Sequence, residues 1–529
     1  MGRRNKLDAS MLLAVCSCMA IAVAQSPSRS EPGSLTGIVS NSVTGNPVVR
    51  AHVTLQSYPN VYGAMTTVDG RFSITTIVPG SYSLLVERRG YSSFTVSGLA
   101  SGQNLEVRAG DEIKGLTLRM VPDAVISGRV LDSNGLPAEA VDVSAVSIAQ
   151  TRFVNTDDRG RFRIGGLRPG RYLIKTLSSP QMLPPEIRTD GSVETNHTRT
   201  YYPSSASAGS AVAVEARAGE ETSGIEIKML RSPILRVSGS VSNVPDSAVQ
   251  PVEVEMLFGQ TRWPVRVESD MTFSAWRVPP GRYRLLARCY SPKYANLVSA
   301  PTLINVSNTN IEGLRLPLMP SRSLTGHVEV EVPDLLTSLK GGARFHLQPL
   351  GGAQYPVSGG VFITNDGSFK IEGIFPLRYY PVGEGLPGNF YVKSARIGGV
   401  ESLGSVLDLS GLSSSDDEMI VQLAAHGAEV SGVVRDAQGP VNGAAVAMFF
   451  DNEFETDLFA DLRTGANGSY TFHGVPPGKY RLLAWKQSDS NASHEKWSSE
   501  ILALYRSVIE NVEAAEGDRI SQDLKLARP

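Results

Sequence analysis

One alternating pattern of apolar and polar positions recurs five times along the chain. Each copy has an aromatic residue, a Pro seven positions later, and a Tyr three positions after that Pro. Apolar side chains alternate after the first aromatic, as in Phe72 and Ile74, and again from the Tyr, as in Tyr82, Leu84 and Val86. A period of two is typical of a strand with one face in a core. The copies are Phe72/Pro79/Tyr82, Phe162/Pro169/Tyr172, Phe273/Pro280/Tyr283, Phe369/Pro376/Tyr379 and Tyr470/Pro477/Tyr480.

Turn residues stand at both ends of the first strand in this pattern. A Gly precedes the aromatic by two positions in four copies, often after Asp or Asn, as in Asp69-Gly70. Such pairs favour the left-handed backbone of tight hairpin turns. Pro-Gly follows in four copies, as in Pro79-Gly80, and predicts a type II turn with positive φ at the Gly. Each copy therefore predicts a strand, a turn and a second strand paired as a hairpin, with another turn type where Leu377 replaces the Gly.

A second motif divides the chain into five repeats. The pattern apolar-[Ser/Thr]-Gly-x-Val opens each one, with its Gly at positions roughly a hundred residues apart, which is the size of a whole domain. A closing strand ends each repeat a few residues before the next begins, so we expect a semi-rigid chain of beads. The opening motifs are LTGIV at Leu35, ISGRV at Ile126, VSGSV at Val237, LTGHV at Leu324 and VSGVV at Val430. The predicted segments are a signal peptide at 1–24, a linker at 25–32, and repeats at 33–121, 122–231, 232–320, 321–425 and 426–529.

Short alternating strands with regular turn signals predict an all-β chain of antiparallel sandwiches. Insertions interrupt the repeats at Pro180–Ser210, Gly351–Gly360, Gly383–Gly388 and Asp451–Asp461. Near the end, Ser498–Arg506 predicts a short helix with Ser498 or Ser499 as its cap, because Ile501, Leu504 and Tyr505 share one helical face.

The opening motif, the D-G-x-F-x-I turn and strand, and P-G-x-Y-x-L together resemble the carboxypeptidase regulatory-like family. The resemblance covers most of the chain from about residue 33, and its motifs are strongest in the first, second and fifth repeats. It implies prealbumin-like, seven-stranded sandwiches within a carbohydrate-binding-like fold, carried by secreted or cell-envelope proteins of bacteria. The family offers no catalytic residue to transfer, since these modules accompany peptidases and receptors.

The N-terminus is typical of a secretory signal. Arg3, Arg4 and Lys6 precede an apolar run that ends at Ala22-Val23-Ala24, and the run is too short to span a bilayer comfortably. An uncleaved anchor is the main alternative, and a lipoprotein at Cys18 a weaker one. Cleavage leaves Cys289 as the one cysteine, for which we expect a buried thiol. The predicted location is secreted, periplasmic or in the outer cell envelope, without a membrane span after cleavage.

Composition limits the classes of partner and reaction. The 529 residues carry a formal net charge of -2, with 50 Lys plus Arg against 52 Asp plus Glu, which gives no support to a nucleic-acid partner. His494-Glu495 lacks the second His of a zinc-protease helix, and no nucleophile elbow or phosphate loop appears. The acidic insertion at Asp451–Asp461 is interpreted as a solvated loop, with calcium as the alternative. We therefore expect no enzyme, metal or cofactor.

Aromatic side chains are the candidate ligand-binding residues, because sugars stack on flat rings. Packing against a neighbouring sheet or repeat is the competing interpretation. The candidates are Trp263, Trp276, Trp485, Trp497, Tyr201 and Tyr202. The sequence thus predicts a non-catalytic envelope scaffold that binds carbohydrate, by resemblance. The alternatives are a structural or adhesive spacer that binds a protein partner, and an enzyme with a site hidden in the insertions.

Overall fold

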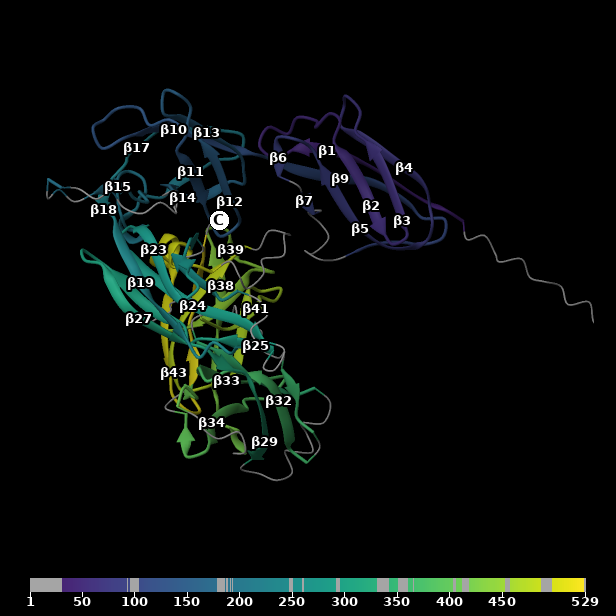
Figure 1. The fold of residues 1–529 in the computed structure, drawn as a ribbon. Coiled ribbons are helices and arrows are strands. Elements are labelled where there is room, and N and C mark those ends of the chain that lie inside the picture. The colour runs from purple at the N-terminus through teal and green to yellow at the C-terminus, as the bar shows by residue number, and fades with distance from the viewer. Residues whose placement is uncertain are drawn as a thin grey trace, which may run out of the picture.

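Strands make up nearly all of the regular structure (Figure 1), so the all-β prediction is confirmed. Among the described residues, no helix is both long and apolar enough to span a bilayer. The predicted signal peptide lies outside the described part of the chain. The computed structural model describes residues 31–527 except for 93, 96–103, 178–185, 187–188, 191, 193, 247–250, 259–260, 292–294, 331–341, 351–359, 365, 403–405, 412–417, 452–456 and 487–496.

The first two repeats each place their strands in two main sheets. In the first repeat, one sheet follows the order β4-β1-β9-β6 and the other β3-β2-β5-β7, with β8 on β5. In the second, the orders are β13-β10-β17 and β12-β11-β14-β16, with β15 and β18 as a separate pair. The strands are β1 (Gly33–Asn41), β2 (His52–Ser57), β3 (Asn60–Met65), β4 (Arg71–Ile77), β5 (Gly80–Glu87), β6 (Tyr91–Ser92), β7 (Phe94–Thr95), β8 (Leu105–Val107), β9 (Glu112–Pro122), β10 (Ala124–Leu131), β11 (Asp142–Val146), β12 (Thr151–Asn155), β13 (Arg161–Leu167), β14 (Gly170–Thr176), β15 (Thr195–His197), β16 (Val214–Ala216), β17 (Glu221–Lys228) and β18 (Arg231–Pro233), with the 3₁₀ turn η1 (Ala208–Ser210).

The third and fourth repeats keep this two-layer plan. The sheets of the third are β22-β23-β19-β27 and β21-β20-β24-β25-β28, with β26 on β24; those of the fourth are β32-β29-β37-β34-β35 and β31-β30-β33-β36. The strands are β19 (Leu235–Ser242), β20 (Glu253–Phe258), β21 (Thr261–Trp263), β22 (Arg266–Val267), β23 (Thr272–Val278), β24 (Gly281–Ser291), β25 (Ala295–Val298), β26 (Thr302–Val306), β27 (Ile311–Pro317), β28 (Met319–Pro320), β29 (Arg322–Val330), β30 (Arg344–Pro349), β31 (Val361–Phe362), β32 (Ser368–Ile374), β33 (Arg378–Glu384), β34 (Tyr391–Ile397), β35 (Val400–Glu401), β36 (Leu407–Asp408) and β37 (Met419–Ala424).

The fifth repeat joins its two layers at the end of the chain. Its last strand, β46, pairs with β38 and also with β43, which belong to opposite layers. The predicted short helix is present as α2, and the Ser498 side chain accepts a hydrogen bond from the backbone N–H of Ile501, as a cap should. The elements are β38 (Ala428–Asp436), β39 (Gly439–Pro440), β40 (Ala445–Phe450), β41 (Leu458–Arg463), β42 (Ser469–Val475), β43 (Gly478–Trp485), α2 (Ser499–Tyr505), η3 (Arg506–Val508), β44 (Glu510–Ala514), β45 (Arg519–Ser521) and β46 (Leu524–Ala527).

The opening strand of every repeat lies between two partners. It runs antiparallel to the strand that carries the first aromatic and parallel to the closing strand, as β1 does with β4 and β9. Each sandwich is therefore antiparallel except for this pair and, in the fifth repeat, the parallel contact of β43 with β46. The Gly of the opening motif is the point at which the backbone of the closing strand comes too near for a side chain. A Cβ on Gly128 would lie 1.9 Å from the carbonyl oxygen of Ile225. The first aromatic, Phe162, lies opposite the same Gly.

The predicted hairpin is wrong, although its two strands are present. β4 pairs with β1 and β5 pairs with β2, so the chain crosses from one sheet to the other at Pro79-Gly80. Gly80 does not have the positive φ that a type II turn needs; Thr76, four positions after Phe72, has a φ of 58°. The Tyr82 hydroxyl then donates to the carbonyl of Val78, 2.7 Å away, and closes the corner.

The same corner recurs in the other repeats. The residue four positions after the first aromatic has a positive φ in all five, and the Tyr of the pattern donates to a carbonyl four residues earlier. A left-handed residue disrupts the ladder as a bulge does, and turns the strand out of its sheet. The Tyr at this position therefore both fills the core and holds the crossover.

The apolar positions predicted to face inward are buried. Phe72, Ile74 and Tyr82 are at most 5% exposed and share one core with the opening strand. Corresponding cores form in the second and third repeats. The Cys289 side chain is 5% exposed, which confirms the expected buried thiol, and burial raises its pKa.

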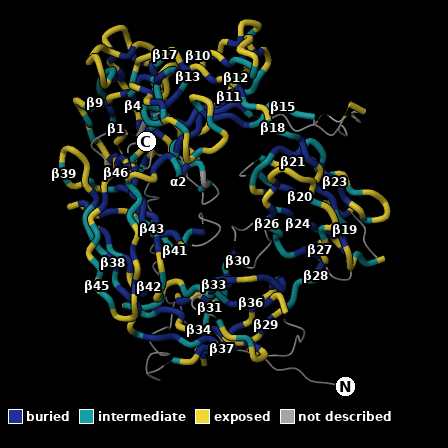
Figure 2. Tube along the Cα trace, turned by 90° about the vertical axis from the view of Figure 1, so that its left-hand side faces the viewer, coloured by how far each residue is buried: buried dark blue, intermediate teal, exposed yellow. Residues whose placement is uncertain are grey.

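Cores of neighbouring repeats share residues, so the later repeats are not separate beads. Leu286 and Val298, from the third repeat, lie in the core of the fourth. Tyr380, from the fourth, lies in the core of the fifth, where its ring stacks on Phe450 at 3.8 Å between centroids. Figure 2 shows the second to fifth repeats arranged in a circuit, with the fifth returning to the second.

Candidate functional site

Where the fifth repeat meets the second, buried charged side chains from both repeats bind one another. The insertion between β43 and β44 forms α2, which lies against β14 and η1 of the second repeat. Its apolar face, with Ile501 and Leu504, packs with Leu173 and Val146 of the second repeat. We call the polar cluster beside this face, formed by Lys175, Arg199, Tyr201 and Glu500, the closing cluster.

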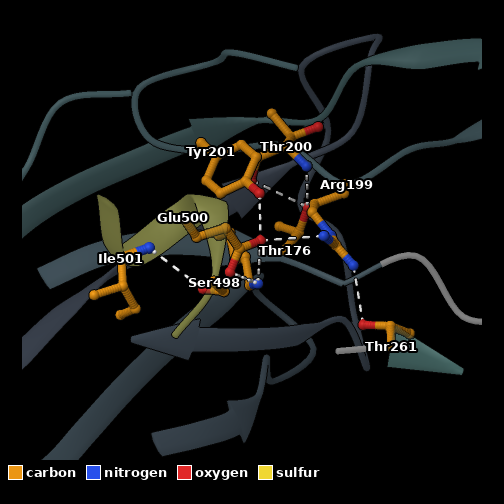
Figure 3. Close-up of polar contacts among 9 residues, drawn as sticks. Thr176, Arg199, Thr200, Tyr201, Thr261, Ser498, Glu500 and Ile501 are labelled. Carbon is orange, nitrogen blue, oxygen red and sulfur yellow. Dashed lines mark hydrogen bonds and ion pairs between the residues drawn. The ribbon is translucent and has the colours of Figure 1, made fainter. Parts of the chain in front are cut away.

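Glu500 is the centre of the closing cluster (Figure 3). The Lys175 ammonium donates to both carboxylate oxygens, at 2.7 and 2.6 Å. The Arg199 guanidinium reaches Oε1 at 3.1 Å, and the Tyr201 hydroxyl donates to that same oxygen. Residues about 300 positions apart in the sequence are therefore joined by charge-assisted hydrogen bonds, the stronger class of such bonds.

Arg199 extends the closing cluster to the third repeat. Its Nη2 donates to the Thr261 hydroxyl on β21 at 2.9 Å, and its guanidinium lies 4.1 Å from the ring centroid of Phe258. A second ion pair links the same repeats, between Arg277 and Glu194 at 2.7 Å, with both side chains at most 14% exposed. The second, third and fifth repeats are thus tied at one junction.

Burial and charge compete in this cluster. The side chains of Lys175, Arg199 and Glu500 are 9%, 6% and 14% exposed. Burial alone would raise the pKa of Glu500, but the nearby positive charges of Lys175 and Arg199 outweigh burial and lower that pKa. Burial lowers the pKa of Lys175, and Glu500 opposes this effect. Burial also raises the pKa of Tyr201, which therefore remains a hydrogen-bond donor.

The closing cluster joins the second and fifth repeats and offers no open group to a ligand. Its carboxylate is already occupied by three donors from the chain, and its neighbours are the apolar residues of the interface. Within the described residues, no group of three His, Cys, Asp or Glu could hold a metal ion. The middle of the acidic insertion, residues 452–456, lies outside the described part.

The aromatic residues predicted to bind ligand fall into two groups. Trp263, Trp485 and Tyr201 are 2%, 7% and 4% exposed, and Trp276, Trp497 and Tyr202 are half-buried. The first group does not offer an open ring to a sugar, and its burial favours the competing interpretation of packing. Packing accounts for their burial. The Trp263 indole N–H donates to the Trp276 carbonyl at 3.1 Å, Trp485 packs at the interface with the second repeat, and Tyr201 belongs to the closing cluster.

Sequence reasoning missed Lys175, Arg199 and Glu500. Charged residues on strands and short helices ordinarily face water, so nothing in their types marked them. One signal was available: the strand Ala445–Phe450 is apolar at every position, and all six residues are buried. A strand without polar alternation has both faces covered, which indicates a second interface outside its own sandwich.

The comparisons with known proteins show a family similarity in three regions of the chain. A family model, the carboxypeptidase regulatory-like domain, matches residues 34–120, 125–199 and 429–522. The matched regions are similar to this family. They lie in the first, second and fifth repeats, in which the motifs are strongest. None of the curated proteins compared with the chain matches it.

Several solved structures show local likeness. The chain is 11% identical to the TIE protein of Bacillus anthracis, with 90% of this chain and 68% of that chain covered and a TM-score of 0.17. It is 15% identical to GBS52, the minor pilin of Streptococcus agalactiae, with 38% and 98% covered and a TM-score of 0.22. For BcpA, the major pilin subunit of Bacillus cereus, identity is 9%, coverage 76% and 99%, and the TM-score 0.14. Scores this low carry no argument about function.

Proposed function

We propose that this protein is a non-catalytic binding scaffold of the cell envelope, in which the second to fifth repeats form one rigid frame. The observation that carries the proposal is the closing cluster. Lys175 and Arg199 of the second repeat are buried together with Glu500 of the fifth, and removal of one of these partners would leave a buried charge without its counter-ion. The secretory pattern of residues 1–24 supports export, and the domain boundaries predicted above belong to the same proposal.

Carbohydrate is the ligand class we propose, because the family resemblance implies it. Of the candidate aromatics, Trp276, Trp497 and Tyr202 keep part of their surface exposed. Trp497 packs edge-on against Phe449 and Trp485, so its replacement would also disturb the interface. Trp276 on β23 is therefore the better position at which to test stacking.

A protein partner is the second candidate, and the edge strand β3 favours it. β3 ends its sheet in the first repeat, with one side of its backbone available to a further strand. Val61 and Met65 on this strand are 65% and 54% exposed, and Tyr58 beside it is fully exposed. Apolar side chains on an open edge are the features that a partner adding a strand would use.

The two candidates are separated by two variants and one control. Residues 25–529 would be screened on a glycan array beside Trp276→Ala, with Phe153→Ala, another exposed aromatic, as the control. Glycan binding that Trp276→Ala loses and Phe153→Ala keeps supports the carbohydrate proposal. Absence of glycan binding, together with an envelope protein that co-purifies with the chain but not with Val61→Lys, supports the protein partner instead.

A further inference from the structure

An arginine-lined cleft lies between the first and second repeats, outside the site described above. Its volume is about 420 Å³, within the range of small-molecule sites. The turn β5–β6 and the segment before β2 form one wall, while β12 and the end of β13 form the other. In Figure 1, β6 of the first repeat approaches β13 of the second, and residues on or next to these two strands line the cleft. Its arginines are Arg50, Arg88 and Arg89 from the first repeat, and Arg152 and Arg168 from the second.

The floor of the cleft is ordered by the link between the two repeats. Asp123 stands between β9 and β10 and accepts a hydrogen bond from the Ser92 hydroxyl at 3.0 Å. Burial raises the pKa of Asp123, and the Ser92 hydrogen bond and the positive charges of Arg152 and Arg168 oppose this effect. The second acid in the lining is Glu87. Five arginines against two acids leave the cleft strongly positive in a chain whose formal net charge is -2.

Three of these arginines have no counter-ion of their own. Within the described residues, the side chains of Arg50, Arg88 and Arg89 form no hydrogen bond or ion pair. The exposed Arg119 and Arg159 are likewise unpaired, whereas other surface arginines of the same repeats have a carboxylate partner. Arg71 pairs with Asp69 at 2.9 Å and Arg129 pairs with Glu226 at 2.6 Å. Guanidinium groups that outnumber the carboxylates beside them repel one another, and an anionic ligand would reduce this repulsion.

Arg50 also occupies a backbone position that favours Gly. Its φ is 55°, in the left-handed region, and its backbone N–H donates to the Thr66 carbonyl. Gly443 has the corresponding place in the fifth repeat, with a φ of 70° and the same hydrogen bond to Thr464. Ala140 has the corresponding place in the second repeat, with a φ of 56° and its N–H on the Thr156 carbonyl, so the position accepts a side chain in two repeats. A side chain at positive φ costs stability, and Arg50 therefore lowers the stability of the first repeat relative to Gly.

We propose that this cleft binds an acidic oligosaccharide, with its arginines holding carboxylates spaced along the sugar chain. Guanidinium groups bind carboxylates through paired hydrogen bonds, and arginines on both walls suit a ligand with several anionic groups. Tyr91 adds an aromatic ring to the lining that suits the neutral part of a sugar. The inference rests on the proposed carbohydrate function, but places the ligand away from Trp276.

Calorimetric titration of residues 25–529 with trigalacturonate tests the inference, with maltotriose as the neutral sugar and tripolyphosphate as the anion that lacks a sugar. The cleft variant is Arg88→Ala with Arg152→Ala, and the matched control is Arg119→Ala with Arg159→Ala, two exposed arginines outside the cleft. We expect trigalacturonate to bind, the cleft variant to weaken binding about tenfold or more, and the control to leave it unchanged. Added salt should weaken binding as well.

A further variant separates binding from folding. Arg50→Gly should weaken trigalacturonate binding while leaving the thermal midpoint unchanged or raised, because it relieves the left-handed backbone. The inference is overturned if trigalacturonate does not bind, if both double variants bind it equally, or if tripolyphosphate alone binds. Binding of neutral sugars that Trp276→Ala abolishes, without any uronate binding, would keep the proposed function and reject this site. Absence of all sugar binding would reject both.

Discussion

Replacing Glu500 by Gln should open the circuit of repeats. The change keeps the size of the side chain but removes the negative charge that faces Lys175 and Arg199, whose side chains are 9% and 6% exposed. Two buried cations would then lie together without a carboxylate. Removal of one partner from a buried ion pair typically costs about 3–5 kcal/mol. We expect a loss near 3 kcal/mol, because the amide still accepts a hydrogen bond from Tyr201.

Urea unfolding followed by tryptophan fluorescence is a suitable assay, because Trp485 and Trp497 lie in the apolar cluster next to α2. Glu500→Gln should lower the urea midpoint of the transition that exposes these rings. Glu513→Gln, at an exposed position in the same repeat, is the matched control and should change little.

The same variant has a defined dependence on pH. The pKa of Glu500 is lowered in the folded protein, so its stabilising contribution is complete above the pKa of an unfolded Glu and is lost as the pH falls through the lower, folded value. The difference in stability between the two proteins should therefore shrink in acid. Equal urea midpoints for Glu500→Gln, Glu513→Gln and the unmodified chain at neutral pH would refute the reasoning.

Three other substitutions or reactions test the fold. Gly128→Ala should destabilise the second repeat by several kcal/mol, since its Cβ would lie 1.9 Å from a carbonyl oxygen, whereas Gly165→Ala should have a small effect. Equal melting temperatures of the two variants by circular dichroism would contradict this account of the crowding. Tyr172→Phe removes the hydrogen bond to the Arg168 carbonyl and should lower the free energy of unfolding in urea by about 1 kcal/mol. An unchanged free energy of unfolding would show that this hydrogen bond does not stabilise the crossover. Cys289 should resist thiol reagents until the protein unfolds, and rapid labelling of the native chain would contradict its burial.

The repeating motifs predicted the core because each motif residue meets a structural requirement set by its neighbours in the same repeat. Phe162 and Tyr172 face inward by alternation, and Gly128 accepts the closing strand without a Cβ. Such requirements leave the same residue types at the same spacing in every repeat. The family match to the first, second and fifth repeats follows from these positions.

The same motifs could not predict which strands pair with one another. A Pro-Gly step marks a change of direction, but the direction depends on which strand receives the chain. In the structure, Gly80 begins a strand of the opposite sheet, and the left-handed residue, Thr76, comes before the Pro. Thr is not a residue that predicts positive φ, so the corner was visible only in repeats with Gly at this position, such as Gly166 and Gly474.

The closing cluster depends on contacts across long sequence separations. Lys175 and Glu500 are 325 residues apart, and no local pattern connects them. Their burial depends on how whole repeats pack against one another. The alternation of apolar and polar residues along a single strand does not predict that packing. The apolar strand Ala445–Phe450 did carry this information, because both of its faces are covered.

Small-angle X-ray scattering of residues 25–529 at neutral pH tests the central claim, that the second to fifth repeats close into one frame. The account predicts a compact particle with the first repeat projecting from it, and a larger maximum dimension for Glu500→Gln. An extended, string-like particle whose dimensions are the same in the unmodified chain and in Glu500→Gln would contradict the claim.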